Sequence, residues 1–268
     1  MTPPRALTIA GSDSGGGAGL QADLRTFFAC GLHGMTAVTA VTVQNSVGVS
    51  GYHVVPPEVV AAQVRAVVTD IGAQAVKTGM LATAGTIAAV AGALDEVDAG
   101  PLVVDPVAAS MHGDPLLHEE ALASYRSALF PRATLVTPNL DEVRLLTGVA
   151  VTSRAGQREA ARVLHDLGPR WVLVKGGHLR DDPECLDLLY DGTDFHEFTG
   201  PRFATEHTHG GGDTLAAAIT SALALGRSVP EAVAFGKGFI TESVRAAYPL
   251  GRGTGPVSPL WRLTSPLP

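Results

Sequence analysis

The chain has three consecutive glycines, Gly210, Gly211 and Gly212, directly before Asp213. Glycine lets the backbone curl, so that successive N–H groups can point at one anion. The apolar run that follows predicts a helix over residues 213–225, and a helix N-terminus adds unpaired N–H groups and a positive partial charge. Asp213 would then lie beside a phosphoryl group during its transfer. The alternative is that Asp213 only caps the helix, as an aspartate after a turn often does.

Asn139 and Glu142 are three residues apart at the start of another predicted helix, which puts both on one face. Their oxygens could hold a hydrated Mg²⁺, which phosphoryl transfer needs to neutralise phosphate charge. A turn that caps the helix explains the same two residues equally well. Lys175 ends an apolar stretch and precedes two glycines, so it could reach phosphates, or its side chain could simply extend from a strand end into solvent.

Two common phosphate-binding loops are absent from the sequence. No Gly-Lys-Ser or Gly-Lys-Thr occurs, which excludes a Walker A loop. The glycine-rich residues 11–19 lie between a predicted strand and a predicted helix, but they lack the Gly-x-Gly-x-x-Gly spacing of a dinucleotide site. What remains is an anion-binding turn with an adjacent carboxylate, which favours phosphoryl transfer.

Strands and helices alternate along the chain, which predicts an α/β fold with an open, mainly parallel sheet and helices on both faces. Several strands are apolar without alternation, as expected of parallel strands covered on both sides. Short antiparallel strands at the sheet edge are expected between residues 187 and 203, and no linker divides the single domain, residues 1–268. The expected strands cover residues 6–10, 35–43, 52–55, 75–77, 102–105, 134–137 and 171–175, and the expected helices cover residues 20–30, 57–70, 86–94, 119–130, 154–167, 213–225 and 230–247.

Polar or otherwise distinctive side chains follow five of these strands. Because ligands of such sheets bind at the carboxyl ends of the strands, these residues are expected to meet at one edge. They are Gln44, Met80, Asp105, Asn139 and Lys175.

Composition limits the partners of the protein. The 268 residues include 26 acidic and 19 basic side chains, a formal net charge of -7, and only three lysines, which are dispersed in the sequence. This argues against a nucleic-acid or membrane surface. Cys30 and Cys185 form no disulfide framework, and no apolar run approaches the ~20 residues of a membrane helix. A soluble, cytoplasmic protein is expected.

The chain resembles the hydroxymethylpyrimidine/phosphomethylpyrimidine kinases of thiamine biosynthesis along nearly its whole length. The motifs occur in the family's order: AGSDSGGGAGLQAD at residues 10–23, VQN at 43–45, KTGM at 77–80, VDPV at 104–107, VTPN at 136–139, VKGGH at 174–178 and GRGTGPV at 251–257. The resemblance implies a ribokinase-like fold. It also implies an ATP- and Mg²⁺-dependent enzyme that phosphorylates a hydroxymethylpyrimidine and then its monophosphate, and the family suggests a homodimer.

The resemblance also implies roles for individual residues. Gln44 would bind the amino and nitrogen edge of the pyrimidine, and its amide offers both a donor and an acceptor for this. Met80 and Val107 would be apolar walls of the pocket, with Gly11 and Asp23 near the hydroxymethyl group. ATP would bind at Asp105, Thr137, Asn139, Lys175 and Gly177, with Mg²⁺ at Asn139 and Glu142 through water.

Two departures from the family keep other interpretations open. The family usually has Gly-Thr-Gly-Cys where this chain has Gly210 to Asp213, whereas related pyridoxal and sugar kinases have Gly-x-Gly-Asp. Asp213 is thus a plausible catalytic base, but pyridoxal kinase stays an alternative, as does a vitamin-binding protein without activity. Met111 stands where the family has lysine, and neighbouring His112 is expected to be idle. His207 and His209 resemble a metal-binding pair, but they lack further ligands.

Overall fold

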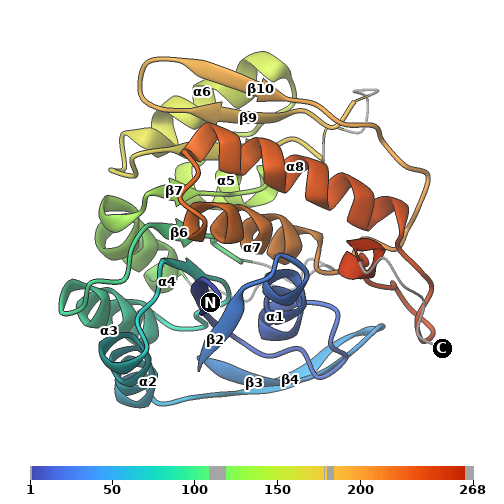
Figure 1. Cartoon of the computed structure of the whole chain (residues 1–268). Helices are drawn as coiled ribbons and strands as arrows, with labels where there is room; N and C mark the ends of the chain where they lie inside the picture. Colours follow the sequence, from blue (N-terminus) through green and yellow to red (C-terminus); the bar gives the residue numbers. More distant parts are fainter. Residues whose placement is uncertain (1, 109–118, 178, 180–183, 263–268) are drawn as a thin grey trace.

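The computed structural model describes residues 2–108, 119–177, 179 and 184–262. Within these residues an eight-stranded sheet runs through the molecule, with six parallel strands and two antiparallel strands at one edge (Figure 1). In sheet order the strands are β10 (Phe195–Phe198), β9 (Asp187–Tyr190), β8 (Val172–Lys175), β7 (Leu135–Val136), β6 (Leu102–Val104), β5 (Ala75–Thr78), β1 (Arg5–Ala10) and β2 (His33–Val38). The predicted mainly parallel sheet with an antiparallel edge is confirmed.

Helices cover both faces of the sheet, and each face has its own apolar core. One core joins the sheet to α2 to α6, and the other joins it to α1, α7 and α8. In Figure 1 the second group lies in front of the sheet. The bounds are α1 (Gly19–Ala29), α2 (Pro57–Asp70), α3 (Ala84–Asp95), α4 (Glu119–Ser124), α5 (Leu140–Thr147), α6 (Arg154–His165), α7 (Gly211–Ala224) and α8 (Val229–Arg245); a π-helical turn (Tyr125–Leu129) and 3-10 turns (Phe130–Arg132, Pro259–Arg262) are shorter.

The prediction of one strand over residues 35–43 is wrong, because the chain changes sheets at Thr39. There β2 ends and β3 (Ala40–Asn45) begins, and β3 pairs antiparallel with β4 (Gly48–Val54) in a separate two-stranded sheet. The Thr39 amide donates to the Ala10 carbonyl, and its hydroxyl donates to the Met80 carbonyl at 2.6 Å. These bonds turn the chain out of the main sheet, and β3–β4 extends past α1 in Figure 1.

No helix in the described part of the chain is long and apolar enough to cross a membrane.

Candidate active site

The glycine turn and α7 form the centre of the carboxyl edge of the sheet. Gly210 is the N-cap of α7 with φ +74°, and a Cβ there would overlap the carbonyl oxygen of Gly17. Only glycine fits this backbone without strain. The helix starts at Gly211, which makes Asp213 its third residue. The alternative that Asp213 is the N-cap is therefore wrong.

Two cavities meet at this helix N-terminus, and Gly211 and Gly212 line both of them. The first, of about 210 Å³, lies between the glycine-rich loop after β1, the β3–β4 sheet and α7. The second, of about 370 Å³, lies between the ends of β8 and β9 and helix α8. A group at the helix N-terminus would therefore be within reach of ligands in both cavities.

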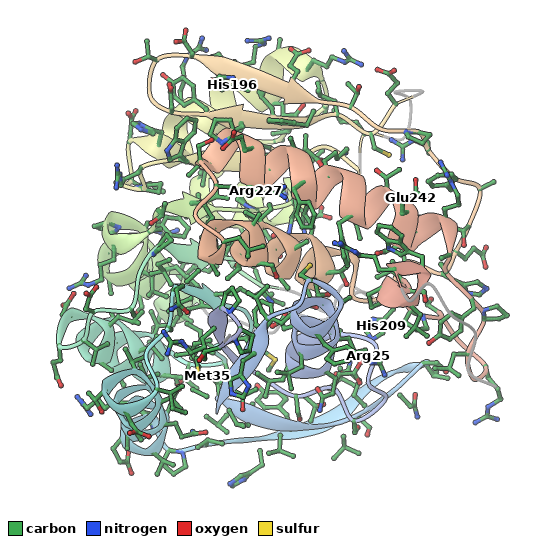
Figure 2. The ribbon with its side chains drawn as sticks, in the orientation of Figure 1. Arg25, Met35, His196, His209, Arg227 and Glu242 are labelled. Atoms are coloured by element: carbon green, nitrogen blue, oxygen red, sulfur yellow. The ribbon has the colours of Figure 1, made fainter. Side chains whose placement is uncertain are left out.

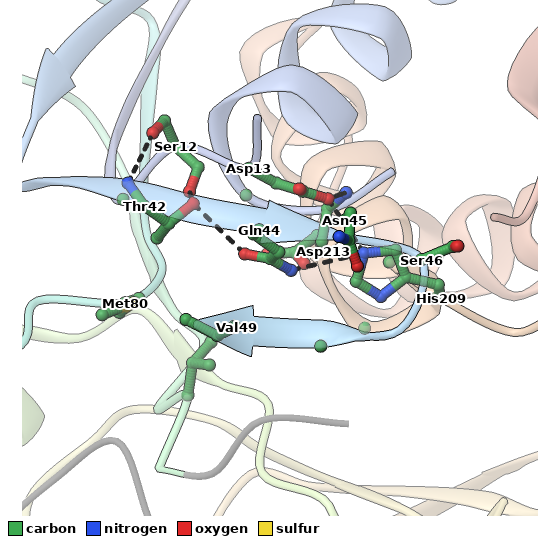
Figure 3. A pocket seen from close by; sticks show the side chains of 18 of the residues that line it. Ser12, Asp13, Thr42, Gln44, Asn45, Ser46, Val49, Met80, His209 and Asp213 are labelled. Atoms are coloured by element: carbon green, nitrogen blue, oxygen red, sulfur yellow. Dashed lines mark hydrogen bonds and ion pairs between the residues drawn. The ribbon is translucent and has the colours of Figure 1, made fainter. Parts of the chain in front are cut away.

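The first cavity brings together most of the residues expected to bind the acceptor. Its lining includes Gly11, Gln44, Met80, Val107, His209, Gly210, Gly211, Gly212 and Asp213. Figure 3 shows the Gln44 side chain pointing toward His209, with Met80 on another wall. Gly11 leaves room for Met80, because a Cβ at residue 11 would lie 3.3 Å from the methionine sulfur.

Gln44 has a fixed backbone and a weakly held amide. The backbone N–H of Gln44 donates to the Ser14 hydroxyl at 2.8 Å, and that hydroxyl donates to the backbone carbonyl of Gln44 at 2.6 Å. The side-chain Oε1 accepts only a 3.3 Å bond from Thr42, and Nε2 lies 3.5 Å from His209 Nε2. The amide is thus held in place but retains hydrogen-bonding capacity for a ligand.

Asp13 and His209 connect the N-terminal loop to the glycine turn. Asp13 Oδ2 accepts bonds of 2.9 Å from the Gly17 and Ala18 amides and from His209 Nε2. Burial would raise the pKa of Asp13, but His209 and the amides outweigh it and hold this pKa below its usual value. The ionised carboxylate is only an acceptor, so His209 Nε2 carries the proton. His209 lies beside α1, the helix that carries Arg25 (Figure 2). The His209 ring is already used in its hydrogen bond to Asp13.

Asp213 forms an ion pair with Lys77 of β5, which sequence reasoning missed as a site residue. Lys77 Nζ lies 3.0 Å from Asp213 Oδ1 and 2.8 Å from Asp23 Oδ1. Burial alone would raise the pKa of Asp213, but the charge and hydrogen bond of Lys77 keep it below its usual value. Asp23 does not reach the cavity: its side chain has no exposed surface, because α1 turns it inward onto Lys77. It can therefore act on a substrate only through other residues.

Lys175 lines the second cavity beside the glycine turn. Its ammonium is 2.8 Å from Asp105 Oδ1, and a Cβ at Gly212 would lie only 3.3 Å from it. Thr137 donates to the same Asp105 oxygen at 3.0 Å. Asp105 is 2% exposed and Thr137 is 0% exposed, and neither lines the second cavity. Asp105 therefore holds Lys175 in place and Thr137 holds Asp105, and direct contact of these two residues with ATP stays a prediction.

Asn139 and Glu142 form a capping box at the start of α5. Asn139 Oδ1 accepts from the Asp141 and Glu142 amides, and Glu142 Oε2 accepts from the Asn139 amide at 2.8 Å. The helix-cap interpretation is confirmed, and the metal hypothesis stays a prediction. Burial raises the pKa of Glu142 to about 7, opposed by Lys175.

A magnesium ion fits this place only in one way. Among the described residues, no group of three or more His, Cys, Asp or Glu side chains could hold a metal ion. The Asn139 and Glu142 oxygens already accept backbone N–H bonds. Mg²⁺ keeps several waters and is commonly held by phosphates with one or two carboxylates, so these residues suit contact through water.

The second cavity also contains Gly177 and a third buried ion pair that the sequence did not reveal. Lys237 of α8 donates to the Cys185 carbonyl at 2.6 Å and to Asp187 Oδ2 at 2.8 Å. Lys77, Lys175 and Lys237 are all the lysines of the chain, and each pairs with a buried aspartate at this edge. Their scarcity among 19 basic residues was the signal that could have identified them.

Comparisons with known proteins agree with this arrangement. The chain matches the family model of phosphomethylpyrimidine kinases over residues 13–258. A hydroxymethylpyrimidine/phosphomethylpyrimidine kinase of Mycobacterium leprae is 62% identical over 268 residues, covering 98% of this chain and 96% of the relative.

Solved structures are similar over most of the chain. A Bacillus subtilis pyridoxal kinase in complex with ADP has a TM-score of 0.90 and 36% identity, covering 98% of this chain and 100% of the other. A phosphomethylpyrimidine kinase of Clostridium difficile 630 has a TM-score of 0.79 and 40% identity, covering 90% and 99%. The chain belongs to the phosphomethylpyrimidine kinase family and is a phosphotransferase with a ribokinase-like fold.

Proposed function

We propose that the protein transfers the γ-phosphoryl group of ATP to the hydroxymethyl group of 4-amino-5-hydroxymethyl-2-methylpyrimidine, and then to the resulting monophosphate, in thiamine biosynthesis. The observation that carries the proposal is the pair of cavities that share Gly211 and Gly212. An acceptor in one and a nucleotide in the other would place the transferring group at the N-terminus of α7, where N–H groups and the helix dipole stabilise negative charge.

The acceptor is proposed to bind in the first cavity. The Gln44 amide suits the aminopyrimidine edge, because it can donate and accept at once. Met80 and Val107 would contact the faces and the methyl group of the ring. The hydroxymethyl group would point toward Asp213, the carboxylate that lines the cavity next to the glycine turn.

The nucleotide is proposed to bind in the second cavity, and the similar Bacillus subtilis pyridoxal kinase was solved as an ADP complex. Lys175 would neutralise phosphate charge, and Gly177 would line the phosphate path. Mg²⁺ bound to the phosphates would supply further charge neutralisation, with Asn139 and Glu142 reaching it through water.

In the first step Asp213 accepts the hydroxyl proton as the acceptor oxygen forms its bond to phosphorus and ADP leaves. The Gly211 amide donates to the Thr208 carbonyl at 3.1 Å, so the amides of Gly210 and Gly212 are those of the glycine turn that would meet the developing negative charge. In the second step the acceptor oxygen belongs to the phosphate of the monophosphate product.

The test is ADP release with hydroxymethylpyrimidine, its monophosphate and pyridoxal as separate acceptors. We expect turnover of both pyrimidines. Pyridoxal kinase activity is the second candidate for two reasons. The solved Bacillus subtilis pyridoxal kinase is similar over 98% of this chain, and Asp213 matches the Gly-x-Gly-Asp pattern of pyridoxal kinases better than the usual cysteine of the pyrimidine kinases. A kcat/KM at least tenfold higher for pyridoxal than for either pyrimidine would overturn the assignment, and so would binding of all three without ADP release.

We also propose that the protein is a cytoplasmic homodimer. The outer face of β3 exposes Val41 and Val43, at 53% and 64% of their surface, which suits contact with a second copy. Light scattering should give twice the chain mass, and Val43→Lys should shift the equilibrium toward monomer. A monomer at all protein concentrations contradicts this proposal.

A further inference from the structure

The buried ion cluster behind Asp213 is built from three elements that pack on one another. Lys77 comes from β5, in register with Thr8 of β1, and both side chains face the layer of α1 and α7. Asp23 of α1 receives both Lys77 and the Thr8 hydroxyl, the latter at 2.6 Å. All three residues, Lys77, Asp23 and Thr8, are fully buried.

Lys77 connects this interior to the cavity. Its ammonium lies 2.8 and 2.9 Å from the two Asp23 oxygens and 3.0 Å from Asp213 Oδ1, and Asp213 itself is 15% exposed at the cavity wall. Gly79 makes this approach possible, because a Cβ there would lie 3.2 Å from Lys77 Nζ. A lysine thus reaches the base from the core side, with no side-chain surface exposed to the cavity.

We infer that Lys77, itself held by Asp23 and Thr8, is a positioning residue that keeps Asp213 ionised and oriented for proton transfer. The inference rests on the proposed role of Asp213 as the base. A carboxylate beside an ammonium favours its charged form, whereas one buried in a protein interior without such a partner favours the neutral form. A protonated Asp213 could not accept the hydroxyl proton.

Other charged groups also surround Asp213. From the sheet, Lys175 of β8 favours its charged form, and Asp105, which follows β6, acts on Lys77. From α1, Asp23 opposes Asp213 as a like charge. The Gly19 amide at the start of α1 stabilises the carboxylate, and Lys237 of α8 is paired with Asp187. Of the charged side chains among these groups, Lys77 is the one in direct contact with Asp213.

A purely structural role for Lys77 predicts a different result from a positioning role. Removing Lys77 alone would leave Asp23 buried without its partner, which destabilises any protein. The double variant Lys77→Met/Asp23→Asn removes both charges together and keeps side chains of similar volume. The single variant Asp23→Asn is its matched control, because the two differ only at residue 77.

The experiment measures kcat for hydroxymethylpyrimidine between pH 5 and pH 8.5, with melting curves to establish folding. In the wild type and in Asp23→Asn, Lys77 holds the pKa of Asp213 below this range, so kcat should show no loss on the acid side from this group. In Lys77→Met/Asp23→Asn a new acid limb should appear within the range, with kcat falling at least about tenfold between pH 8 and pH 5.5. The KM for ATP should stay within about twofold.

A double variant whose profile has the same shape as that of Asp23→Asn overturns the inference. If the double variant does not fold, Lys77→Gln/Asp23→Asn replaces it, because this pair also removes both charges and keeps a polar side chain at residue 77. An acid limb in that variant supports the inference, and a profile with the shape of the Asp23→Asn profile overturns it. Asp213→Asn is measured alongside: if it stays active on the hydroxyl acceptor, the proposed base itself fails, whereas an inactive Asp213→Asn with no new limb in the double variant overturns the role of Lys77 alone.

Discussion

Asp213→Asn should separate the two phosphorylation steps, because their acceptors differ in whether a proton must be removed. The substitution keeps the side-chain shape, and it does not disturb the N-cap, which is Gly210. Lys77 keeps both of its bonds to Asp23, so its ammonium stays paired. The lost attraction between the Asp213 charge and the helix N-terminus corresponds to about 1 kcal/mol, which lowers the melting temperature by about 2–4 °C in a domain of this size.

The first step transfers to an alcohol, whose proton must leave as the new bond forms. A positioned base contributes typically about 10²–10⁴-fold, so kcat for hydroxymethylpyrimidine should fall by this factor in Asp213→Asn. The second step transfers to a phosphate monoester, whose second pKa is about 6. At pH 8 this acceptor is already ionised, and asparagine repels it less than aspartate does. We expect its kcat to fall less than about tenfold.

The assay supplies each acceptor separately at pH 8 with saturating ATP, follows ADP release, and separates the mono- and diphosphate products by anion exchange. Asp95→Asn is the control, since Asp95 pairs with Arg132 on the surface. Equal losses in the two steps would refute the reasoning, because they would mean that Asp213 acts on something other than the acceptor proton. More than a third of wild-type kcat on the alcohol would show that the base lies elsewhere.

Three further predictions concern other parts of the site. Gln44→Ala should raise the KM of the pyrimidine by about 10- to 100-fold, since an unsatisfied ring edge costs about 1–3 kcal/mol. Steady-state kinetics should show an unchanged KM for ATP, and an equal rise of both KM values would show that Gln44 does not belong to the acceptor pocket. Gly210→Ala should lower the melting temperature and abolish turnover, because the alanine methyl group would overlap the Gly17 carbonyl and the backbone there is left-handed. Gly226→Ala is the control, since Gly226 also has a positive φ but open space around its Cβ position. Equal losses of melting temperature and turnover in the two variants contradict this account. The melting temperature should rise as the pH is lowered from 8 to 5, because burial raises the pKa of Asp23 and Glu142 to about 7 and the folded state therefore binds their protons before the unfolded state does. It should fall below pH 4, because the pKa values of Asp13 and Asp213 are lowered in the folded state and their stabilising contribution is lost in acid. Asp23→Asn should flatten the slope between pH 5 and pH 8, and an unchanged slope contradicts the assignment to Asp23.

The sequence predicted the sheet well because each strand reports its own burial. The run at Leu102–Val104 is apolar throughout, and in the structure it is covered on both faces. Strand ends could also be located, which is why Asp105 and Lys175 were placed at the right edge, whereas Gln44 reaches the site from the separate β3–β4 sheet. The change of sheet at Thr39 was missed because its cause is non-local: the bonds from Thr39 go to residues 10 and 80.

The ion pairs show the same limit at the level of side chains. Lys77 stands in an apolar strand, and its partners Asp23 and Asp213 are 54 and 136 residues away in sequence. Nothing local indicates which carboxylate a buried lysine meets. Asn139 and Glu142 are the opposite case, because a capping box is a local pattern and the sequence left only its purpose open.

The pairing of every lysine with a buried aspartate has a consequence for the surface chemistry of the protein. Lys77, Lys175 and Lys237 expose 0%, 13% and 9% of their side chains, and the other basic side chains are arginines and histidines. Acylating reagents that attack amines will therefore find no freely exposed lysine on the folded enzyme. Acylation of Lys175 and Lys237, both in the lining of one cavity, should slow further when that cavity is filled, so mass-spectrometric labelling can report its occupancy without any measurement of turnover.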